Sequence, residues 1–322
     1  MRAVITDSKK CVKFTALFNN LKQFTNNILL NFKKDGIYIQ CLDDSHCCLF
    51  EANLASKWFN TYDVKAPVTI GINLGMFYKV LNARHETQAI ELCLQKNKPD
   101  LVFINFIMGA SGNFDKYFEL SLIDIQMELM NVVENETLVD LHMETKTFCE
   151  MIGQFMIFDD MLTITFNEDK ISLKASGSDG KMRTELRLDD VKEYVTAESI
   201  TLVQSYSLRY INMMCHFNKL SADLYMGFSD TMPMLMKYDL GEDSYASFHL
   251  APKITDEDQA DEEEQAEQDQ LDQDQDEEEQ AEQDQLDQVQ DEQDQAEQDQ
   301  DEQEDADSDN EIVSKMTNIK IK

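Results

Sequence analysis

The chain has 322 residues, 42% of them apolar, and its 63 acidic side chains outnumber 28 basic ones, which gives a net charge of −35. The segment Asp256–Glu311 alone contains 30 acidic residues and no Lys or Arg, so the preceding body carries 33 acidic and 25 basic side chains, a net charge of −8. A body of this length holds one large domain or two ordinary ones, which excludes a small disulfide-stapled protein.

The cysteines and the N-terminus indicate where the protein works. Seven cysteines, an odd number, are scattered through apolar segments, which is typical of reduced thiols in an intracellular compartment. The N-terminus lacks the apolar region of a signal peptide, and no stretch approaches the ~18 uncharged apolar residues of a membrane span. We therefore expect a soluble intracellular protein with no membrane partner.

The first predicted element is an amphipathic helix over Lys9–Phe24, whose aromatic and leucine side chains recur at helical spacing. A second helix is predicted over Asn73–Arg84, with Asn73 as its N-cap. Between and after them, alternating apolar and polar residues are typical of half-buried strands. These strands are expected at Ile37–Ile39, Leu49–Leu54, Ile90–Leu94, Leu101–Ile107 and Tyr117–Ile125.

The body contains an internal repeat. Phe32–Ile39 resembles Phe166–Leu173, and Asn73–Phe77 resembles Ser207–Ile211, both at an offset of 134 residues. The repeat predicts an α+β fold with two similar domains, each built of two βαβββ units, with antiparallel strands and all four helices on one side. The expected segments are domain 1 (1–124), a connecting loop (125–137), domain 2 (138–254), an acidic tail (255–310) and a short C-terminal segment (311–322).

The tail is of low complexity. The block DEEEQAEQDQLDQ occurs at 261–273 and again at 276–288. Its few apolar side chains cannot offset an ordering entropy of ~1–2 kcal/mol per residue, so we expect disorder. A solubilising role is the first interpretation, and DNA mimicry or repulsion of nucleic acid is the alternative. Residues 311–322 turn apolar and basic again, and docking on the body or on a partner both remain open.

The sequence carries no pattern typical of an enzyme. The five histidines lie far apart without metal-ligand spacing, and the phosphate-binding and nucleophile-elbow motifs are absent. Asp43, Asp44, Ser45 and His46 are sequence neighbours that point in diverging directions, whereas a catalytic triad needs spatial convergence. We expect no enzyme activity, no metal and no cofactor.

Five motifs, in order and in register, carry a family resemblance. They are IQCLDDSHCCLF (39–50), FNTY (59–62), GINLGMFYKVLN (71–82), LRYIN (208–212) and LAPKI (250–254). Over residues 1–254 the chain resembles the eukaryotic-type sliding clamp family, proliferating cell nuclear antigen. The acidic extension has no counterpart there, which suggests a divergent member such as a large DNA virus encodes.

The resemblance implies a DNA clamp fold with sheets outside and helices inside, and a homotrimeric ring that encircles duplex DNA without sequence preference. It further implies a processivity factor in DNA replication and repair, DNA polymerase and other clients that insert a hydrophobic and aromatic peptide, and an ATP-dependent clamp loader. The implied location is the nucleus or, for a viral member, the host nucleus or a cytoplasmic replication factory.

A sliding protein should contact phosphates and leave base edges unread, and the resemblance places a set of basic side chains on the DNA-facing helices. Thr15, Gly153 and Ile157 stand where the family commonly has basic or imidazole groups, so the positive lining is expected to be thin. The expected DNA-facing residues are Lys22, Lys79, Arg84, Lys146, Arg209, His216 and Lys219.

The resemblance also implies a client groove and a ring seam. His249 stands where the family usually has tyrosine, which predicts a more polar groove. The groove residues are Leu42, His46, Cys47, Leu49, Met130, Val132, Pro233, His249 and Ala251. The seam pairs the edge strands 113–120 and 178–186, whose opposite charges would set the register. The seam residues are Asp115, Tyr117 and Glu119 on one edge and Lys181 and Arg183 on the other.

Three alternatives remain open. A monomeric or dimeric processivity factor of the herpesvirus type would need a strongly basic face, which an acidic body does not favour. A checkpoint-type subunit that forms only hetero-rings is favoured by imperfect charge pairing, because Lys116 and Glu185 spoil strict complementarity at the seam. A chaperone or DNA mimic would place the function in residues 256–310.

Overall fold

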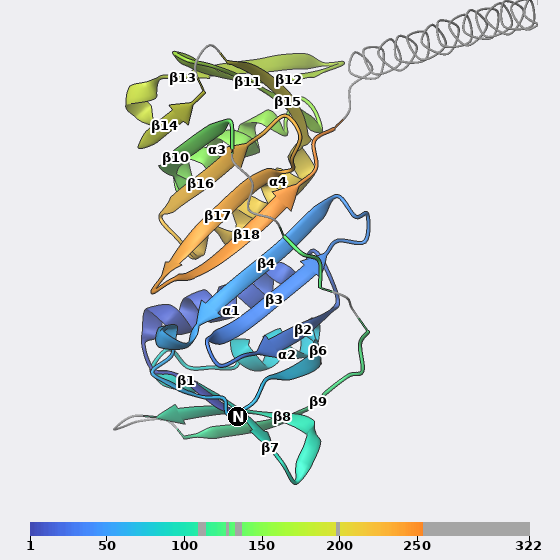
Figure 1. Ribbon diagram of the computed structural model, residues 1–322, viewed down its shortest axis with the longest axis vertical. Helices are drawn as coiled ribbons and strands as arrows, with labels where there is room; N and C mark the ends of the chain where they lie inside the picture. Colours follow the sequence, from blue (N-terminus) through green and yellow to red (C-terminus); the bar gives the residue numbers. More distant parts are fainter. Residues whose placement is uncertain (109–113, 127–128, 133–136, 198–199, 254–322) are drawn as a thin grey trace, which may run out of the picture. The chain divides into compact units, whose positions relative to one another are not determined.

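The computed structural model describes residues 1–108, 114–126, 129–132, 137–197 and 200–253 (Figure 1). Residues 1–253 form one compact unit. The predicted acidic tail and the C-terminal segment lie outside the described residues. Among the described residues, no helix is long and apolar enough to span a membrane.

Four βαβββ units follow one another, as the sequence repeat predicted. The first contains β1 (Arg2–Ile5), α1 (Ser8–Leu21), β2 (Asn27–Phe32), β3 (Gly36–Leu42) and β4 (Cys48–Ala55). The second contains β6 (Val68–Asn73), α2 (Leu74–Asn82), β7 (Gln88–Gln95), β8 (Lys98–Met108) and β9 (Lys116–Ser121). The third contains β10 (Val139–Glu144), α3 (Thr145–Phe155), β11 (Met161–Asn167), β12 (Lys170–Gly177) and β13 (Gly180–Leu186). The fourth contains β15 (Thr201–Ser207), α4 (Leu208–Cys215), β16 (Asp223–Phe228), β17 (Met234–Gly241) and β18 (Ser244–Leu250).

Shorter elements connect these units. The additional strands are β5 (Thr61–Asp63) and β14 (Glu193–Thr196), and the 3-10 turns are η1 (Ser56–Trp58), η2 (Leu188–Asp190) and η3 (His216–Lys219). Within the described residues, every pair of neighbouring named strands is antiparallel, as expected.

The strands form three sheets. The orders are β5-β1-β7-β8-β9, β14-β10-β16-β17-β18-β4-β3-β2-β6 and β13-β12-β11-β15. The nine-stranded sheet runs through both halves of the unit, because β18 of the second half pairs with β4 of the first along Tyr245–Leu250. Figure 1 shows all four helices on one side, behind this sheet. The predicted α+β fold of the single chain, with antiparallel sheets and four helices on one side, is therefore confirmed.

Aromatic side chains on the inner faces of α1 and α2 hold these helices together. Phe18 lies edge-on to Phe14 and to Phe77, with ring centroids 4.9 and 4.8 Å apart, and all three side chains are buried. Edge-to-face packing of this kind adds to the stabilisation from burial alone. The apolar periodicity predicted from the sequence is thus the packing face of the helices.

The helix boundaries differ slightly from those predicted. Helix α1 begins one residue earlier than predicted, because the Asp7 carboxylate accepts a hydrogen bond from the Lys10 main-chain N–H at 2.9 Å. It ends at Leu21, so Lys22 belongs to the turn that follows. At α2 the predicted N-cap is confirmed, because Asn73 Oδ1 accepts from the Met76 N–H at 3.0 Å. The helix ends at Asn82, two residues before the predicted end at Arg84.

Candidate functional site

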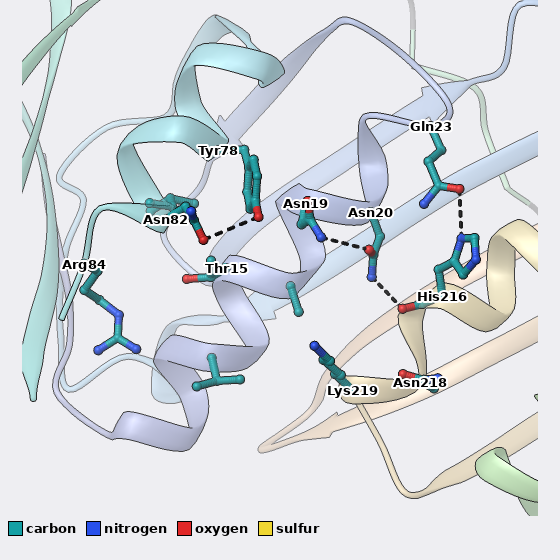
Figure 2. A pocket seen from close by; sticks show the side chains of 13 residues that line it. Thr15, Asn19, Asn20, Gln23, Tyr78, Asn82, Arg84, His216, Asn218 and Lys219 are labelled. Atoms are coloured by element: carbon teal, nitrogen blue, oxygen red, sulfur yellow. Dashed lines mark hydrogen bonds between the residues drawn. The ribbon is translucent and has the colours of Figure 1, made fainter. Parts of the chain in front are cut away.

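On the helix side of the sheet, a pocket of about 610 Å³ lies between α1, α2 and η3 (Figure 2). Three of the predicted DNA-facing residues, Arg84, His216 and Lys219, line it. The other polar residues that line it are uncharged. They are Thr15, Asn19, Asn20, Gln23, Tyr78, Asn82 and Asn218.

Hydrogen bonds inside this pocket join the two halves of the unit. The Asn20 amide donates to the main-chain oxygen of His216 at 2.7 Å, and the His216 ring nitrogen Nδ1 lies 2.9 Å from Gln23 Oε1 (Figure 2). Asn20 and Gln23 come from α1 and its C-terminal turn, whereas His216 begins η3. Amide groups therefore connect α1 and its C-terminal turn to η3 on this polar face.

The predicted basic residues near this pocket differ in their surroundings. Lys22 is exposed, with Nζ 3.8 Å from the centroid of the Tyr78 ring, a cation–π contact. Lys79 is exposed on α2. Arg84 Nη1 donates to the main-chain oxygens of His85, Glu86 and Gln88 at 3.0, 2.9 and 2.8 Å. Part of the Arg84 guanidinium thus stabilises the turn after α2.

Helix α3 contributes little positive charge. Lys146 Nζ lies 3.7 Å from a carboxylate oxygen of Glu150, one turn further along the helix. Gly153 and Ile157 are exposed, and Ile157 keeps 76% of its surface in contact with solvent. Arg209 is exposed at the start of α4. Neither Lys146 nor Arg209 lines the pocket that holds Arg84 and Lys219.

The opposite face of the nine-stranded sheet carries a second pocket of about 850 Å³. Val132, Pro233 and His249 of the predicted groove line it. The pairing of β3, β4, β18 and β17 aligns Leu42, Leu49, His249 and Leu235 in one cross-strand row, so that these side chains share this face.

The remaining predicted groove residues lie close to this row. The Ala251 N–H donates to the Cys47 oxygen at 2.9 Å, which holds the chain after β18 against the β3–β4 loop. His46 and Cys47 are exposed in that loop, and His46 has a positive φ of 60°. Met130 keeps 53% of its surface exposed.

The residue that holds Met130 in place, Gln40, was not among the predicted groove residues. Gln40 donates from Nε2 to the Met130 oxygen at 3.0 Å and accepts from the Met130 N–H at 2.7 Å. Gln40 is buried within β3 between apolar neighbours. A buried amide inside a strand motif is the signal that could have pointed to it, because buried polar groups need partners.

A buried carboxylate organises the adjoining part of the second pocket. Glu51 accepts hydrogen bonds from the hydroxyls of Tyr38, Ser247 and Tyr245 at 2.8, 3.3 and 3.4 Å. Burial raises the pKa of Glu51, but interactions with His249, Tyr38 and Ser247 outweigh it, and the pKa lies below the ordinary value. Burial and the adjacent carboxylate raise the pKa of Tyr38. Glu51 is therefore charged at neutral pH, and Tyr38 keeps its proton.

Asp43 organises the β3–β4 loop and is not part of a triad. Its carboxylate accepts from the N–H groups of Ser45, Cys47 and Cys48 at 3.0, 2.8 and 2.7 Å, and also from the Tyr210 hydroxyl on α4. The hydroxyl–carboxylate bond connects the loop to a helix of the other half. Among the described residues, no group of three His, Cys, Asp or Glu side chains is arranged to hold a metal.

The two predicted seam strands are sheet edges: β9 ends the five-stranded sheet and β13 the four-stranded sheet. Tyr117 is 69% exposed, and its hydroxyl donates to Asp115 at 3.2 Å. Glu119 already pairs with Lys98 at 2.9 Å. Arg183 pairs with Glu185 at 2.7 Å, and Lys181 is exposed. Phe114 lies within the predicted seam strand 113–120, just before β9, and is 75% exposed.

The comparisons with known proteins agree with this architecture. Residues 8–132 match the family model "Proliferating cell nuclear antigen, N-terminal domain", and residues 132–253 match the model for its C-terminal domain. The chain belongs to the proliferating cell nuclear antigen family. It is thus a sliding clamp of this family, whose members are not enzymes, and the expected lack of enzyme activity is confirmed.

Curated relatives of the chain come from distant organisms. "Proliferating cell nuclear antigen" of Chaetomium thermophilum is 27% identical over 241 residues, 73% of this chain and 92% of the relative. "Proliferating cell nuclear antigen 2" of Plasmodium falciparum is 26% identical over 254 residues, 76% and 96% of the two chains. The protein of the same name from Drosophila melanogaster is 23% identical over 238 residues, 74% and 92%.

A solved structure shares the fold. A chain in the crystal structure of the PCNA2–PCNA3 complex from Sulfolobus tokodaii superposes with a TM-score of 0.69 at 22% identity. The match covers 79% of this chain and 99% of that chain. The acidic tail lies beyond both matched family domains.

Proposed function

We propose that copies of this chain close into a homotrimeric ring around duplex DNA and act as a processivity clamp in DNA replication and repair. The observation that carries the proposal is the arrangement of four helices on one face of sheets that end in the edge strands β9 and β13. Each edge offers main-chain groups for pairing with another copy. Such pairing is head-to-tail, and it closes into a ring where the rotation between subunits allows.

The helix face supports contact with DNA that carries no sequence preference. Lys22, Lys79, Arg209 and Lys219 are exposed there, and the amides around Asn19 and Asn82 add neutral hydrogen-bonding groups. A face with a small number of cations among neutral polar groups binds phosphates weakly, and weak contacts allow a protein to slide along DNA. Persistence on DNA then depends on topology more than on affinity.

The second pocket supports recruitment of DNA polymerase and other clients. Val132 of the connecting segment and Met232, Pro233 and Leu235 provide apolar lining, and the exposed Met130 adds an adaptable wall. A peptide with a hydrophobic and aromatic plug fits this surface. The proposal includes the domain boundaries 1–124, 125–137 and 138–254, loading by an ATP-dependent clamp loader, and work in the nucleus or, for a viral chain, in the host nucleus or a cytoplasmic replication factory.

A hetero-ring is the second candidate. Glu119 and Arg183 lie on the two edges of the proposed homotypic seam and already have partners within the chain, Lys98 and Glu185. The similar fold of a chain in a PCNA2–PCNA3 complex agrees with this alternative. A subunit of a hetero-ring would stay monomeric or dimeric alone and would complete a ring only with a different chain.

Retention on circular DNA tests the function directly. The full chain is loaded onto nicked circular DNA with a clamp loader, the complex is isolated, and the DNA is then cut once. A ring is expected to stay bound to the circle and to leave after the cut, and native mass spectrometry is expected to give three copies. Binding that survives the cut would reject topological linkage, and a monomer in the mass spectrum would favour the hetero-ring.

A further inference from the structure

His249 and Glu51 form an unusual pair in the wall of the second pocket. Their side chains are 19% and 11% exposed, and His249 Nε2 lies 3.9 Å from Glu51 Oε1. That nitrogen is buried and has no hydrogen-bond partner. The separation is too long for a hydrogen bond, so the carboxylate acts on the ring through its charge.

The charge next to Nε2 decides which ring nitrogen carries the proton. Neutral imidazole has one N–H and one lone pair. A lone pair on Nε2 would face the negative carboxylate, whereas an N–H there is attracted to it. The arrangement therefore favours the tautomer with hydrogen on Nε2, and Nδ1 becomes a hydrogen-bond acceptor.

The other groups around this pair leave the assignment unchanged. Three hydroxyl groups already donate to Glu51. Lys237, on the neighbouring strand β17, holds its ammonium 4.6 Å from the centroid of the Tyr245 ring. The apolar residues Val132, Pro233 and Leu235 line the same pocket as the His249 side chain.

We propose that His249 makes this groove selective for a client peptide whose aromatic plug carries a hydroxyl group, a tyrosine in preference to a phenylalanine. The aromatic ring of the client tyrosine packs against the apolar lining of the groove, and its phenolic O–H donates to Nδ1 of His249. Glu51 is a positioning residue, because it acts through the tautomer of His249. The inference rests on the proposed client groove and adds to it a rule for client choice.

The test compares two peptides that differ by one oxygen atom. Each carries an apolar residue followed by an aromatic residue, Tyr in one and Phe in the other, and binding to the full chain is measured by fluorescence anisotropy. One additional neutral hydrogen bond corresponds to a preference of about 3- to 10-fold for the Tyr peptide. In His249→Phe the ratio of the two affinities is expected to fall to about one, whatever the absolute affinity for the Phe peptide.

Two further variants separate positioning from packing. Glu51→Gln removes the charge that selects the tautomer, so the ratio between the peptides should fall toward one. Tyr245→Phe, which removes a hydroxyl next to Glu51 and keeps the carboxylate, should retain the ratio. Thermal melting of each variant checks that it is folded.

The outcomes separate the two proposals. Equal binding of both peptides by the unchanged chain, or a Tyr preference that survives in His249→Phe, would overturn the role of His249 and leave the groove standing. Failure of both peptides to bind, or binding that is unaffected by Val132→Asp in the groove wall, would reject the client groove and the selectivity with it.

Discussion

Gln40 and Met130, ninety residues apart, form two reciprocal hydrogen bonds between a side-chain amide and the main chain. The Gln40 Nε2 group also donates to the Tyr38 hydroxyl at 2.9 Å, and Tyr38 in turn donates to Glu51. The connecting segment is thereby linked to the polar network that reaches His249. Hydrogen bonds to a side chain of strand β3 thus hold the described part of this segment around Met130.

The first prediction concerns this anchor. Gln40→Ala is expected to weaken client peptide binding about 5- to 20-fold, because the loss of two hydrogen bonds of ~0.5–1.5 kcal/mol each leaves the groove wall unfixed. Isothermal titration with an apolar–aromatic peptide measures the effect. Gln23→Ala, on the opposite face of the sheet, is the control and should bind normally. An unchanged affinity in Gln40→Ala would show that the wall does not depend on this anchor.

The second prediction concerns Asp43. Burial raises its pKa, but hydrogen bonds from Tyr210 and from the N–H groups of Cys48, Ser45 and Cys47 outweigh this, and the pKa lies below the ordinary 3.8. A carboxylate with a lowered pKa stabilises the fold above its unfolded pKa, and the contribution disappears as the pH falls through the folded pKa. Asp43→Asn should therefore reduce the free energy of unfolding at pH 7 by about 2 kcal/mol.

Urea unfolding at pH 7 and again near pH 3 measures this difference. The difference in the free energy of unfolding between the unchanged chain and Asp43→Asn should become smaller in acid, because protonation of Asp43 removes the same charge as the substitution. Tyr210→Phe removes a single donor and serves as a milder comparison. A gap that stays constant across the pH range would contradict a role for the ionised carboxylate.

The third prediction concerns the salt dependence of DNA binding. Each lysine that contacts a phosphate contributes about 0.9 to the slope of log K against log salt concentration on duplex DNA. Lys79→Ala plus Lys219→Ala should therefore lower the slope by about 2. Asn19→Ala plus Asn82→Ala is the matched control: the affinity should fall while the slope stays the same. Equal slopes in all three proteins would place the two lysines away from DNA.

The fourth prediction concerns the edge strands. Lys181→Glu plus Arg183→Glu should give monomers in analytical ultracentrifugation, because like charges would then face each other at the proposed seam. Tyr117→Ala should also weaken assembly, since it removes a 69% exposed aromatic side chain from the other edge. Lys33→Glu plus Lys34→Glu, in the β2–β3 turn, changes the net charge equally and should leave the trimer intact. A trimer in the first variant would reject the seam.

Much of the fold followed from local patterns in the sequence. Asn73 and Ser207 are 134 residues apart in the sequence repeat, and the helices α2 and α4, which begin one residue after them, are separated by the same distance. Two copies of one fold place corresponding helices at the same position, so their apolar residues recur at the same offset. The end of α1 was harder to predict, since Lys22 and Phe24 continue its amphipathic pattern after the helix has ended.

Parts of the site could not be predicted from such patterns. Periodicity reports which side chains are buried and gives no information on distant hydrogen-bond partners. The bonds of Gln40 to Met130 and of Tyr210 to Asp43 span 90 and 167 residues. Arg84 was predicted as a DNA contact from its position, whereas its bonds to three main-chain oxygens became evident only from the folded turn.

The pairing of β18 with β4 has a mechanical consequence. Six residue pairs, from Tyr245↔Asn53 to Leu250↔Cys48, join β18 to β4 and so connect the strands of the first and the fourth βαβββ units in one continuous sheet. Bending such a subunit in the middle would require these ladder bonds to break together. A closed assembly of these subunits would accordingly behave as stiff arcs with softer joints, and a gap wide enough to admit a double helix would open between neighbouring chains.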